Sequence, residues 1–391
     1  MAGYLFLIGG DTDEQAYENL EQCIRTGLYS TYIKPPKEKN WRPEVASTFA
    51  DYLSMRAGDN VYFFSKRKIY GVGLLVDIKN ACKYKNFPDA SEAKVYKYKD
   101  TKEDLLFDTG SGSQHNRWLC VFKPYPAFFR TGVDMDELLQ SAPEKIRIIR
   151  TMQGVSFIKM DDDENKAVRD FIIYKNRNSI NDETMHFPFV DGEHSKIKRK
   201  LSYKYSLKAS DIMDQRATPT GILDHEMALE CGVIELLLND KSVNEVLGNW
   251  KYISHQVIAS PFKPLAYVSK MDIFGYRYIS GLPDGYDSSV SDYLVIELKA
   301  RNAYADCVEQ LLRYVEWVKQ EYAHGDYSRI KAFLIAKSFN QSAIDVLKTS
   351  AVRHYTEGGR SPKTVTWAGL KFIKYRYDNA TRKLLLDLVE Q

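Results

Sequence analysis

The sequence predicts an α+β protein of two domains, a small β-barrel at the N-terminus and an α/β domain at the C-terminus. Residues 1–175 contain several short apolar stretches typical of strands, with few and short helices between them. Residues 221–391 follow the order helix, three strands, helix, strand. Between them, residues 176–220 are polar, with a dense basic cluster from Lys196 to Lys204. This stretch is typical of a linker or of an arm that contacts phosphates.

Length and composition are those of an ordinary globular protein. The chain has 391 residues, enough for two domains that each bury a core. No apolar run approaches the roughly 20 residues of a membrane span, so we expect no membrane association. The N-terminus lacks the pattern of a signal peptide, and the five cysteines form no C-x-x-C pair. We therefore expect a cytoplasmic protein without structural zinc or disulfides. The net charge of +3 neither requires nor excludes nucleic acid.

The predicted N-terminal domain alternates strands with short helices. Its strands are expected in the stretches YLFLIGG, NVYFFS, KIYGVGLL, RWLCVF and GVSFIKM. The second and third of these form a hairpin around a basic turn. Helices are expected over 13–27 and 45–55, after residue 126, and over 161–175, where acidic residues occupy the first turn.

This order resembles the EVE group of PUA-like domains. The matching positions are Trp41 before a helix, then Gly58-Asp59, Phe63-Phe64-Ser65 and Tyr70-Gly71-Val72-Gly73. Arg42-Pro43 and Lys66-Arg67 depart from the group's pattern, which leaves the ligand open. The resemblance implies a pocket that holds a flipped or modified base, with Trp41, Phe64 and Ser65 as the base-binding residues. On the residues alone, residues such as Trp41 and Phe64 belong more often to the core than to a pocket.

The predicted C-terminal domain begins with a helix from residue 221, followed by a strand over 252–259. A strand that carries Asp272 and the strand YLVIELK (293–299) then form a hairpin. A helix from Ala305, a buried strand over 330–339, a helix over 341–351 and a last strand over 366–377 complete the domain.

Three charged residues converge in this hairpin. Period-two alternation places Glu297 and Lys299 on one face of their strand, and pairing brings Asp272 opposite them. Carboxylates gathered at a buried sheet are costly unless they bind something. A divalent cation is the simplest ligand. Asp284, in the literal sequence Pro283-Asp284, is a rival for Asp272, although P-D-G-Y-D is typical of a turn.

The same residues resemble the PD-(D/E)XK nuclease superfamily, in particular its RecB-like and NucS-like members. Glu297-Leu298-Lys299 matches the E-x-K motif, and Gln310 with Tyr314 matches the Q-x-x-x-Y of the next helix. The resemblance implies that Asp272, Glu297 and the carbonyl of Leu298 hold Mg²⁺, with Mn²⁺ as a substitute. It also assigns catalytic roles to Glu226, Asp272, Glu297, Lys299, Gln310 and Tyr314. Glu230 is the alternative to Glu226, and Gln256 resembles a glutamine of the NucS group.

Together these patterns predict a Mg²⁺-dependent endonuclease for double-stranded DNA. The resemblances favour modification-dependent restriction, in which the N-terminal domain recognises a flipped modified base. The alternatives are a NucS-like repair endonuclease for mismatched or branched DNA and a non-catalytic nucleic-acid-binding protein. The intact set of Asp272, Glu297 and Lys299 disfavours the last of these. A homodimer is left open.

Overall fold

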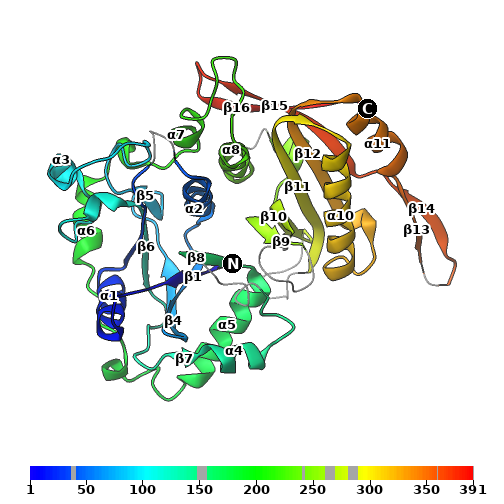
Figure 1. The fold of residues 1–391 in the computed structure, drawn as a ribbon. Helices are drawn as coiled ribbons and strands as arrows, with labels where there is room; N and C mark the ends of the chain where they lie inside the picture. Colours follow the sequence, from blue (N-terminus) through cyan, green and yellow to red (C-terminus); the bar gives the residue numbers. More distant parts are fainter. Residues whose placement is uncertain are drawn as a thin grey trace. The chain divides into compact units, whose positions relative to one another are not determined.

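The computed structural model describes residues 1–36, 41–147, 156–239, 243–259, 269–280, 289–358 and 360–390. The chain forms two compact units, Met1–Leu207 and Lys208–Gln391. Each unit mixes helices with a sheet, so the predicted α+β class is confirmed (Figure 1). The boundary between the units falls inside the stretch 176–220 that was expected to be a linker.

Unit 1 is built on one sheet with the strand order β2-β6-β4-β3-β1-β8, to which β5 and β7 are added at β6 and β4. Its strands are β1 (Gly3–Leu7), β2 (Leu28–Tyr32), β3 (Asn60–Ser65), β4 (Lys68–Leu75), β5 (Lys83–Lys85), β6 (Asn116–Pro124), β7 (Val133–Asp134) and β8 (Phe157–Met160). Its helices are α1 (Asp13–Thr26), α2 (Pro43–Ser54), α3 (Tyr98–Thr101), α4 (Met135–Ser141), α5 (Asp162–Lys175) and α6 (Gly192–Lys200). The predicted strands and the hairpin β3–β4 are present.

The sheet of unit 1 curls into a half-barrel. Strands β2 and β8 stand at opposite ends of the strand order. The hydroxyl of Tyr29 in β2 nevertheless donates a hydrogen bond of 3.0 Å to the carbonyl of Ser156, just before β8. The rings of Tyr29 and Phe157 also meet edge to face, with centroids 6.2 Å apart. Aromatic packing therefore links the two ends of the sheet through side chains, and a closed barrel of strand pairing is not confirmed.

The basic stretch expected as a linker is instead helix α6 of unit 1. Ile197 on this helix is 1% exposed and packs in a core cluster with Leu28 and Leu119. The ammonium of Lys200 donates to the carbonyl of Leu105 at 2.7 Å. The density of charge indicated a solvated segment, whereas the helix docks on unit 1 through its two buried residues, His194 and Ile197. Lys198 and Arg199 remain exposed on it.

Unit 2 has a six-stranded sheet with the order β16-β15-β12-β11-β10-β9. Its strands are β9 (Tyr252–Ile258), β10 (Lys270–Tyr278), β11 (Val290–Ala303), β12 (Ile330–Phe339), β15 (Leu370–Asp378) and β16 (Lys383–Leu388), with β13 (Arg353–Glu357) and β14 (Lys363–Trp367) forming a separate ribbon. Its helices are α7 (Ser210–Met213), α8 (Glu226–Asn239), α9 (Asn244–Leu247), α10 (Ala305–Glu321) and α11 (Gln341–Ser350). Strands β11, β12 and β15 run parallel, and β9, β10 and β11 run antiparallel.

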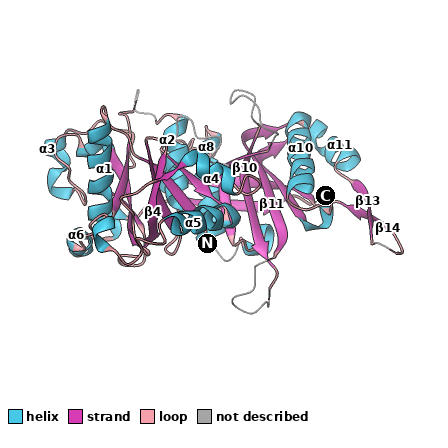
Figure 2. Cartoon of the chain, turned by 90° about the horizontal axis from the view of Figure 1, so that it is seen from below, coloured by secondary structure: helices cyan, strands magenta, loops and turns pink. Residues whose placement is uncertain are grey.

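The order α8, β9, β10, β11, α10, β12, α11 follows the sequence prediction. Helix α8 packs on strands β9, β10 and β11, while α10 packs on β11 and β12. In Figures 1 and 2 these two helices lie on either side of the sheet. The long strand β11 is buried over its apolar run from Tyr293 to Leu298, as expected for a central strand covered by helices on both faces.

The last predicted strand, 366–377, is in fact two strands. Strand β14 ends at Trp367 and β15 begins at Leu370, with Gly369 between them. A Cβ at Gly369 would lie 2.3 Å from Nε1 of Trp367, so only glycine allows the chain to turn so closely against the indole. Because apolar and aromatic residues continue on both sides of this turn, the residue pattern did not reveal the break between the two strands.

Among the described helices, none is at once long enough and apolar enough to cross a membrane.

Candidate active site in unit 2

The hairpin β10–β11 places Asp272 beside Glu297. Ile273 lies opposite Ile296 in the ladder, and the same register continues to Asp272 and Glu297, which therefore share one face of the sheet. Oδ2 of Asp272 accepts a hydrogen bond of 2.8 Å from the backbone N–H of Leu298. Glu297 is 1% exposed. The convergence predicted from alternation is thus present in the structure.

Lys299 extends this cluster toward helix α8. Its ammonium lies 2.7 Å from Oε1 of Glu297 and 3.8 Å from Oε1 of Glu226, the first residue of α8. Burial alone would lower the pKa of Lys299, but the charges of Glu297 and Glu226 and the hydrogen bond to Glu297 outweigh it and raise the pKa. Lys299 is therefore a charged ammonium at neutral pH, held against Glu297.

The carboxylates resist ionisation in the metal-free protein. Burial is the main cause that raises the pKa of Asp272, and the charges on Glu297 and Glu230 add to it. Burial likewise raises the pKa of Glu297 to about 7, although Lys299 lowers it in part. Several carboxyl groups thus lie close together where little solvent reaches, and a cation between their oxygens would favour their ionised forms.

The donor set fits a hard cation. Oε2 of Glu297 is buried and makes no hydrogen bond to any part of the protein that the structure describes. Within those same residues, no group of three His, Cys, Asp or Glu side chains is arranged to hold a metal by itself. Mg²⁺ usually binds through one or two carboxylates and completes its shell with water and substrate oxygens. Asp272 and Glu297, with the Leu298 carbonyl, match that pattern.

A second layer of polar residues supports Asp272 from strand β9. The side-chain amide of Gln256 donates to Oδ1 of Asp272 at 3.2 Å and to Oε2 of Glu230 at 2.9 Å. The other oxygen of Glu230 lies 2.5 Å from Nδ1 of His255. Both Glu230 and His255 are buried. Gln256 has a φ of 52°, a left-handed conformation that is rare for glutamine.

This layer includes residues that sequence reasoning missed or ranked second. His255 was expected to be structural, like the other histidines, and Glu230 was only the alternative to Glu226. Both glutamates lie at the site, at different positions. Glu226 is nearly half exposed and faces Lys299, whereas Glu230 is buried and contacts Gln256. The available signal was the polar run Ser254-His255-Gln256 inside an otherwise apolar strand.

Gln310 and Tyr314 lie one turn apart on α10. Nε2 of Gln310 donates to the hydroxyl of Tyr314 at 2.8 Å. Burial raises the pKa of Tyr314, and the charges on Glu297 and Asp272 raise it further, which places this hydroxyl within the field of the site. The rival aspartate, Asp284, lies outside the described residues.

None of the three predicted base-binding residues of unit 1 lines the pocket described below. Trp41 is 4% exposed, donates its indole N–H to the carbonyl of Ser91 at 2.9 Å, and has the Arg117 guanidinium 5.2 Å from its ring centre. Phe64 packs against the core cluster around Tyr62, and Ser65 is buried. These contacts are those of core residues.

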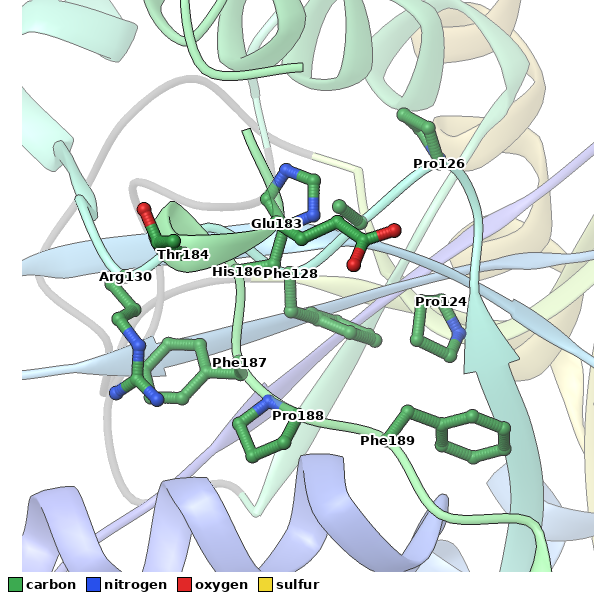
Figure 3. A pocket seen from close by; sticks show the side chains of 11 residues that line it. Pro124, Pro126, Phe128, Arg130, Glu183, Thr184, His186, Phe187, Pro188 and Phe189 are labelled. Carbon is green, nitrogen blue, oxygen red and sulfur yellow. The ribbon is translucent and has the colours of Figure 1, made fainter. Parts of the chain in front are cut away.

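A pocket of about 460 Å³ lies elsewhere in unit 1, between residues 124–130 and 183–189 (Figure 3). Phe128 lies at its centre, with Phe187, Phe189 and prolines around it and Arg130 and Glu183 beside them. The motif Gly71-Val72-Gly73 makes room for Phe128. A Cβ at Gly71 would lie 2.2 Å from this ring, and one at Gly73 would lie 2.4 Å from it.

Residues 277–363 match the family model of the endonuclease NucS C-terminal domain. The matched range includes Glu297, Lys299, Gln310 and Tyr314 and begins after Asp272. It covers less than a quarter of the chain, so it describes the core of unit 2 and not the whole protein.

Solved structures also show a partial likeness to this chain. A repair endonuclease from Pyrococcus abyssi shares 23% identity over 37% of this chain and 46% of its own, with a TM-score of 0.22. A complex of EndoMS with double-stranded DNA shares 23% identity over 30% of this chain and 40% of its own, with a TM-score of 0.20. EndoMS in its apo form shares 23% identity over 29% of this chain and 38% of its own, with a TM-score of 0.19. This chain spans less than half the length of each. Among curated proteins no relative matches it.

Proposed function

We propose that this protein is a metal-dependent DNA endonuclease of the repair kind, which cleaves duplexes that contain a mismatch or a branch. The proposal rests on the clustering of Asp272, Glu297 and Lys299 on one face of a hairpin. Glu297 and Lys299 lie inside the region that matches the NucS model, and Asp272 lies just before it. The repair reading takes precedence over restriction of modified DNA because the similarity concerns NucS and a repair endonuclease.

Each residue of the site has a task in phosphodiester hydrolysis. Asp272, Glu297 and the Leu298 carbonyl would hold Mg²⁺ through hard oxygen ligands. When bound, this ion neutralises charge on the scissile phosphate and lowers the pKa of a water. Lys299 lies beside these ligands and would orient the attacking water or offset charge that develops on the phosphate. Gln310 and Tyr314 would position the phosphate or brace Lys299.

The residues behind Asp272 would orient this ligand for metal binding and would take no part in the hydrolysis itself. Gln256 fixes one oxygen of Asp272, and the Leu298 N–H fixes the other. Second-layer hydrogen bonds of this kind orient ligands and commonly change metal affinity by about 10- to 100-fold. The pair of Glu230 and His255 in turn holds Gln256 from the far side. Glu230 is therefore proposed as a positioning residue and Glu226 as the carboxylate that contacts Lys299.

The role of unit 1 is proposed separately, because the family match concerns unit 2. Unit 1 would select the DNA by holding an unpaired base, and the reading of a modified base rests on its sequence resemblance. Since Trp41 is engaged in the core, the pocket around Phe128 and Phe189 is a competing place for that base.

One experiment tests these readings together. The full chain is incubated with three duplexes of one sequence, which are fully paired, mismatched at one position, or modified at one base, each with Mg²⁺ or with EDTA. Cleavage confined to the mismatched duplex and to Mg²⁺ supports the proposal. Cleavage confined to the modified duplex replaces repair by restriction. Tight binding without cleavage in Mg²⁺ or Mn²⁺ supports the non-catalytic alternative.

A further inference from the structure

The β13–β14 ribbon is an unusual element of unit 2. Arg353–Glu357 and Lys363–Trp367 pair with each other in five antiparallel steps and form a two-stranded sheet separate from the six-stranded one. Figures 1 and 2 show the ribbon extending away from the sheet and helices of this unit. Two strands alone are marginally stable in water, so a ribbon that protrudes in this way needs an anchor.

Its anchor lies at its base. Trp367 is 5% exposed and donates its indole N–H to the carbonyl of Ile330 at 3.0 Å. Nε of Arg353, opposite Trp367, lies 2.9 Å from Oε1 of Glu316 on α10. The ring of Tyr355 packs on Tyr327 with centroids 5.5 Å apart. One face of the ribbon is therefore fixed to the body of unit 2 near the start of β12.

The opposite face is left open and is entirely polar. Residues directly opposite each other share a face, so the pairs His354–Thr366 and Thr356–Thr364 lie together. All four are exposed. They offer hydroxyl and imidazole groups without a carboxylate, and Nδ1 of His354 lies 3.1 Å from Oγ1 of Thr366. Cross-strand threonine pairs help to hold the two strands together, and the same hydroxyl and imidazole groups are exposed to a binding partner.

The far end of the ribbon is basic. Arg360 and Lys363 are exposed there, and Glu357 is the acidic residue of the two strands, opposite Lys363 on the other face. A two-stranded ribbon fits the major groove of DNA, and hydroxyls and basic side chains are the usual contacts to phosphates. Ile330 pairs with Tyr293, four residues before Glu297 in β11, so the anchor lies roughly 13 Å along the sheet from the cluster of Asp272, Glu297 and Lys299.

We infer that the β13–β14 ribbon is a duplex-DNA contact separate from the cleavage site, with the face of His354, Thr356, Thr364 and Thr366 toward the groove and Arg360 and Lys363 toward phosphates. The inference rests on the proposed function for the identity of the partner. Unit 2 would then contact the DNA at a second point, and its affinity for DNA would depend on the duplex that flanks the scissile bond.

The test uses the full chain in EDTA, where binding is measured without cleavage. Affinity for a paired duplex is determined by fluorescence anisotropy over a range of salt concentrations for wild type and for Arg360→Ala/Lys363→Ala. We expect the double variant to bind roughly tenfold more weakly, with a plot of log affinity against log salt less steep by about 2, because two phosphate contacts are lost. Thr356→Val/Thr364→Val/Thr366→Val, which keeps residues that favour strands, should also weaken binding. The charge-matched control, Lys371→Ala/Lys374→Ala on β15, should leave the slope nearly unchanged.

The outcomes separate this inference from the proposed function. If wild type and Arg360→Ala/Lys363→Ala bind with equal affinity and equal salt slope, the ribbon is not a DNA contact, whereas the endonuclease proposal stands. An equal loss in the Lys371→Ala/Lys374→Ala control would also overturn the inference, since it would indicate unspecific attraction. If the ribbon variants change only the oligomeric state, the ribbon pairs with a second copy instead. If wild type binds no DNA at low salt, both proposals fail.

Discussion

Gln256 lies across the sheet from Asp272 and donates its amide to one oxygen of that carboxylate over 3.2 Å. The same amide reaches Glu230, so one side chain donates to carboxyl groups from two different elements. It does so from a left-handed backbone conformation that costs of order 1–3 kcal/mol for a residue other than glycine. Strain of this kind persists only where the surrounding contacts hold it in place. If the site binds a metal as proposed, Gln256 would affect the metal affinity by holding Asp272 in place.

Gln256→Leu should make the site less responsive to Mg²⁺. The substitution leaves Oδ1 of Asp272 and Oε2 of Glu230 without their amide donor, which should lower the free energy of unfolding by about 1–3 kcal/mol. The Mg²⁺ concentration for half-maximal cleavage should rise about 10- to 100-fold, with activity largely restored at saturating Mg²⁺. Mg²⁺ titrations of cleavage measure this. Gln341→Leu, which removes an exposed amide–carboxylate pair on α11, is the control. Equal Mg²⁺ dependence in both variants would contradict a positioning role.

Asp272→Asn and Lys299→Met should abolish cleavage while DNA binding in EDTA persists. The first removes a proposed metal ligand, and the second removes the ammonium held 2.7 Å from Glu297. We expect single-turnover cleavage to fall about 100- to 1000-fold in each, on the order of the loss of an electrostatic catalytic group. Asp284→Ala is the matched comparison, since it tests the rival aspartate. If Asp272→Asn is active and Asp284→Ala is inactive, the assignment of the metal to Asp272 is wrong and Asp284 is the ligand.

The stability of the metal-free protein should fall as pH rises from about 4.5 to 7. The pKa of Glu297 is raised from 4.5 to about 7 in the folded state, chiefly by burial. Below pH 4.5 this carboxyl is protonated in both states, so its protonated form contributes fully to stability. As pH rises, the unfolded chain releases the proton first, and the free energy of unfolding declines by up to about 3 kcal/mol. The raised pKa of Asp272 acts in the same direction.

Urea unfolding in EDTA at pH 5, 6, 7 and 8 measures this decline. Glu297→Gln cannot ionise at this position, so the difference in stability between it and wild type should grow with pH in favour of the variant. Mg²⁺ should restore wild type at pH 8 and leave Glu297→Gln largely unaffected. A difference that is independent of pH would show that Glu297 ionises normally in the folded protein.

Gly71→Ala should destabilise unit 1 strongly. Gly71 has a φ of 63°, and an added Cβ would lie 2.2 Å from the ring of Phe128 and 2.3 Å from its Cα, so that rotating the ring aside would not relieve the clash. We expect a loss of about 3 kcal/mol or more in the free energy of unfolding, from overpacking and backbone strain together. Thermal unfolding measures it. Gly9→Ala is the control because nothing lies within 4 Å of its added Cβ. A near-neutral Gly71→Ala would mean that Phe128 does not fill this space.

Trp41→Ala should act first on folding. The indole N–H is bonded to Ser91 and the ring lies against Arg117, so truncation should cost about 3–5 kcal/mol. Phe189→Ala, in the half-exposed lining of the pocket, should leave stability nearly unchanged. If unit 1 holds an unpaired base in that pocket, Phe189→Ala should weaken binding of mismatched DNA about 5- to 100-fold. A Trp41→Ala protein of normal stability that has lost base discrimination would restore Trp41 as the binding residue.

The sequence by itself determined the features of this protein that depend on local periodicity. Two-residue alternation in YLVIELK placed Glu297 and Lys299 on one face, and pairing with the preceding strand brought Asp272 beside them. Gln310 and Tyr314, singled out by the resemblance to Q-x-x-x-Y, lie one helical turn apart and contact each other. In each case the residues lie within one hairpin or one helical turn, where the backbone geometry fixes which side chains are neighbours.

Only the tertiary structure decided contacts between elements that are distant along the chain. Glu230 and His255 join the site because α8 packs on β9, a matter of helix placement that a single sequence does not encode in its periodicity. The basic stretch expected as a linker became α6 because Ile197 finds a core formed by β2, β5 and β6. Trp41 could have lined a pocket or filled the core. It is buried because the carbonyl of Ser91 accepts its indole N–H and the guanidinium of Arg117 lies over its ring. Burial of an amphipathic side chain depends on the partners that folding brings to it, and those partners lie 50 or more residues away.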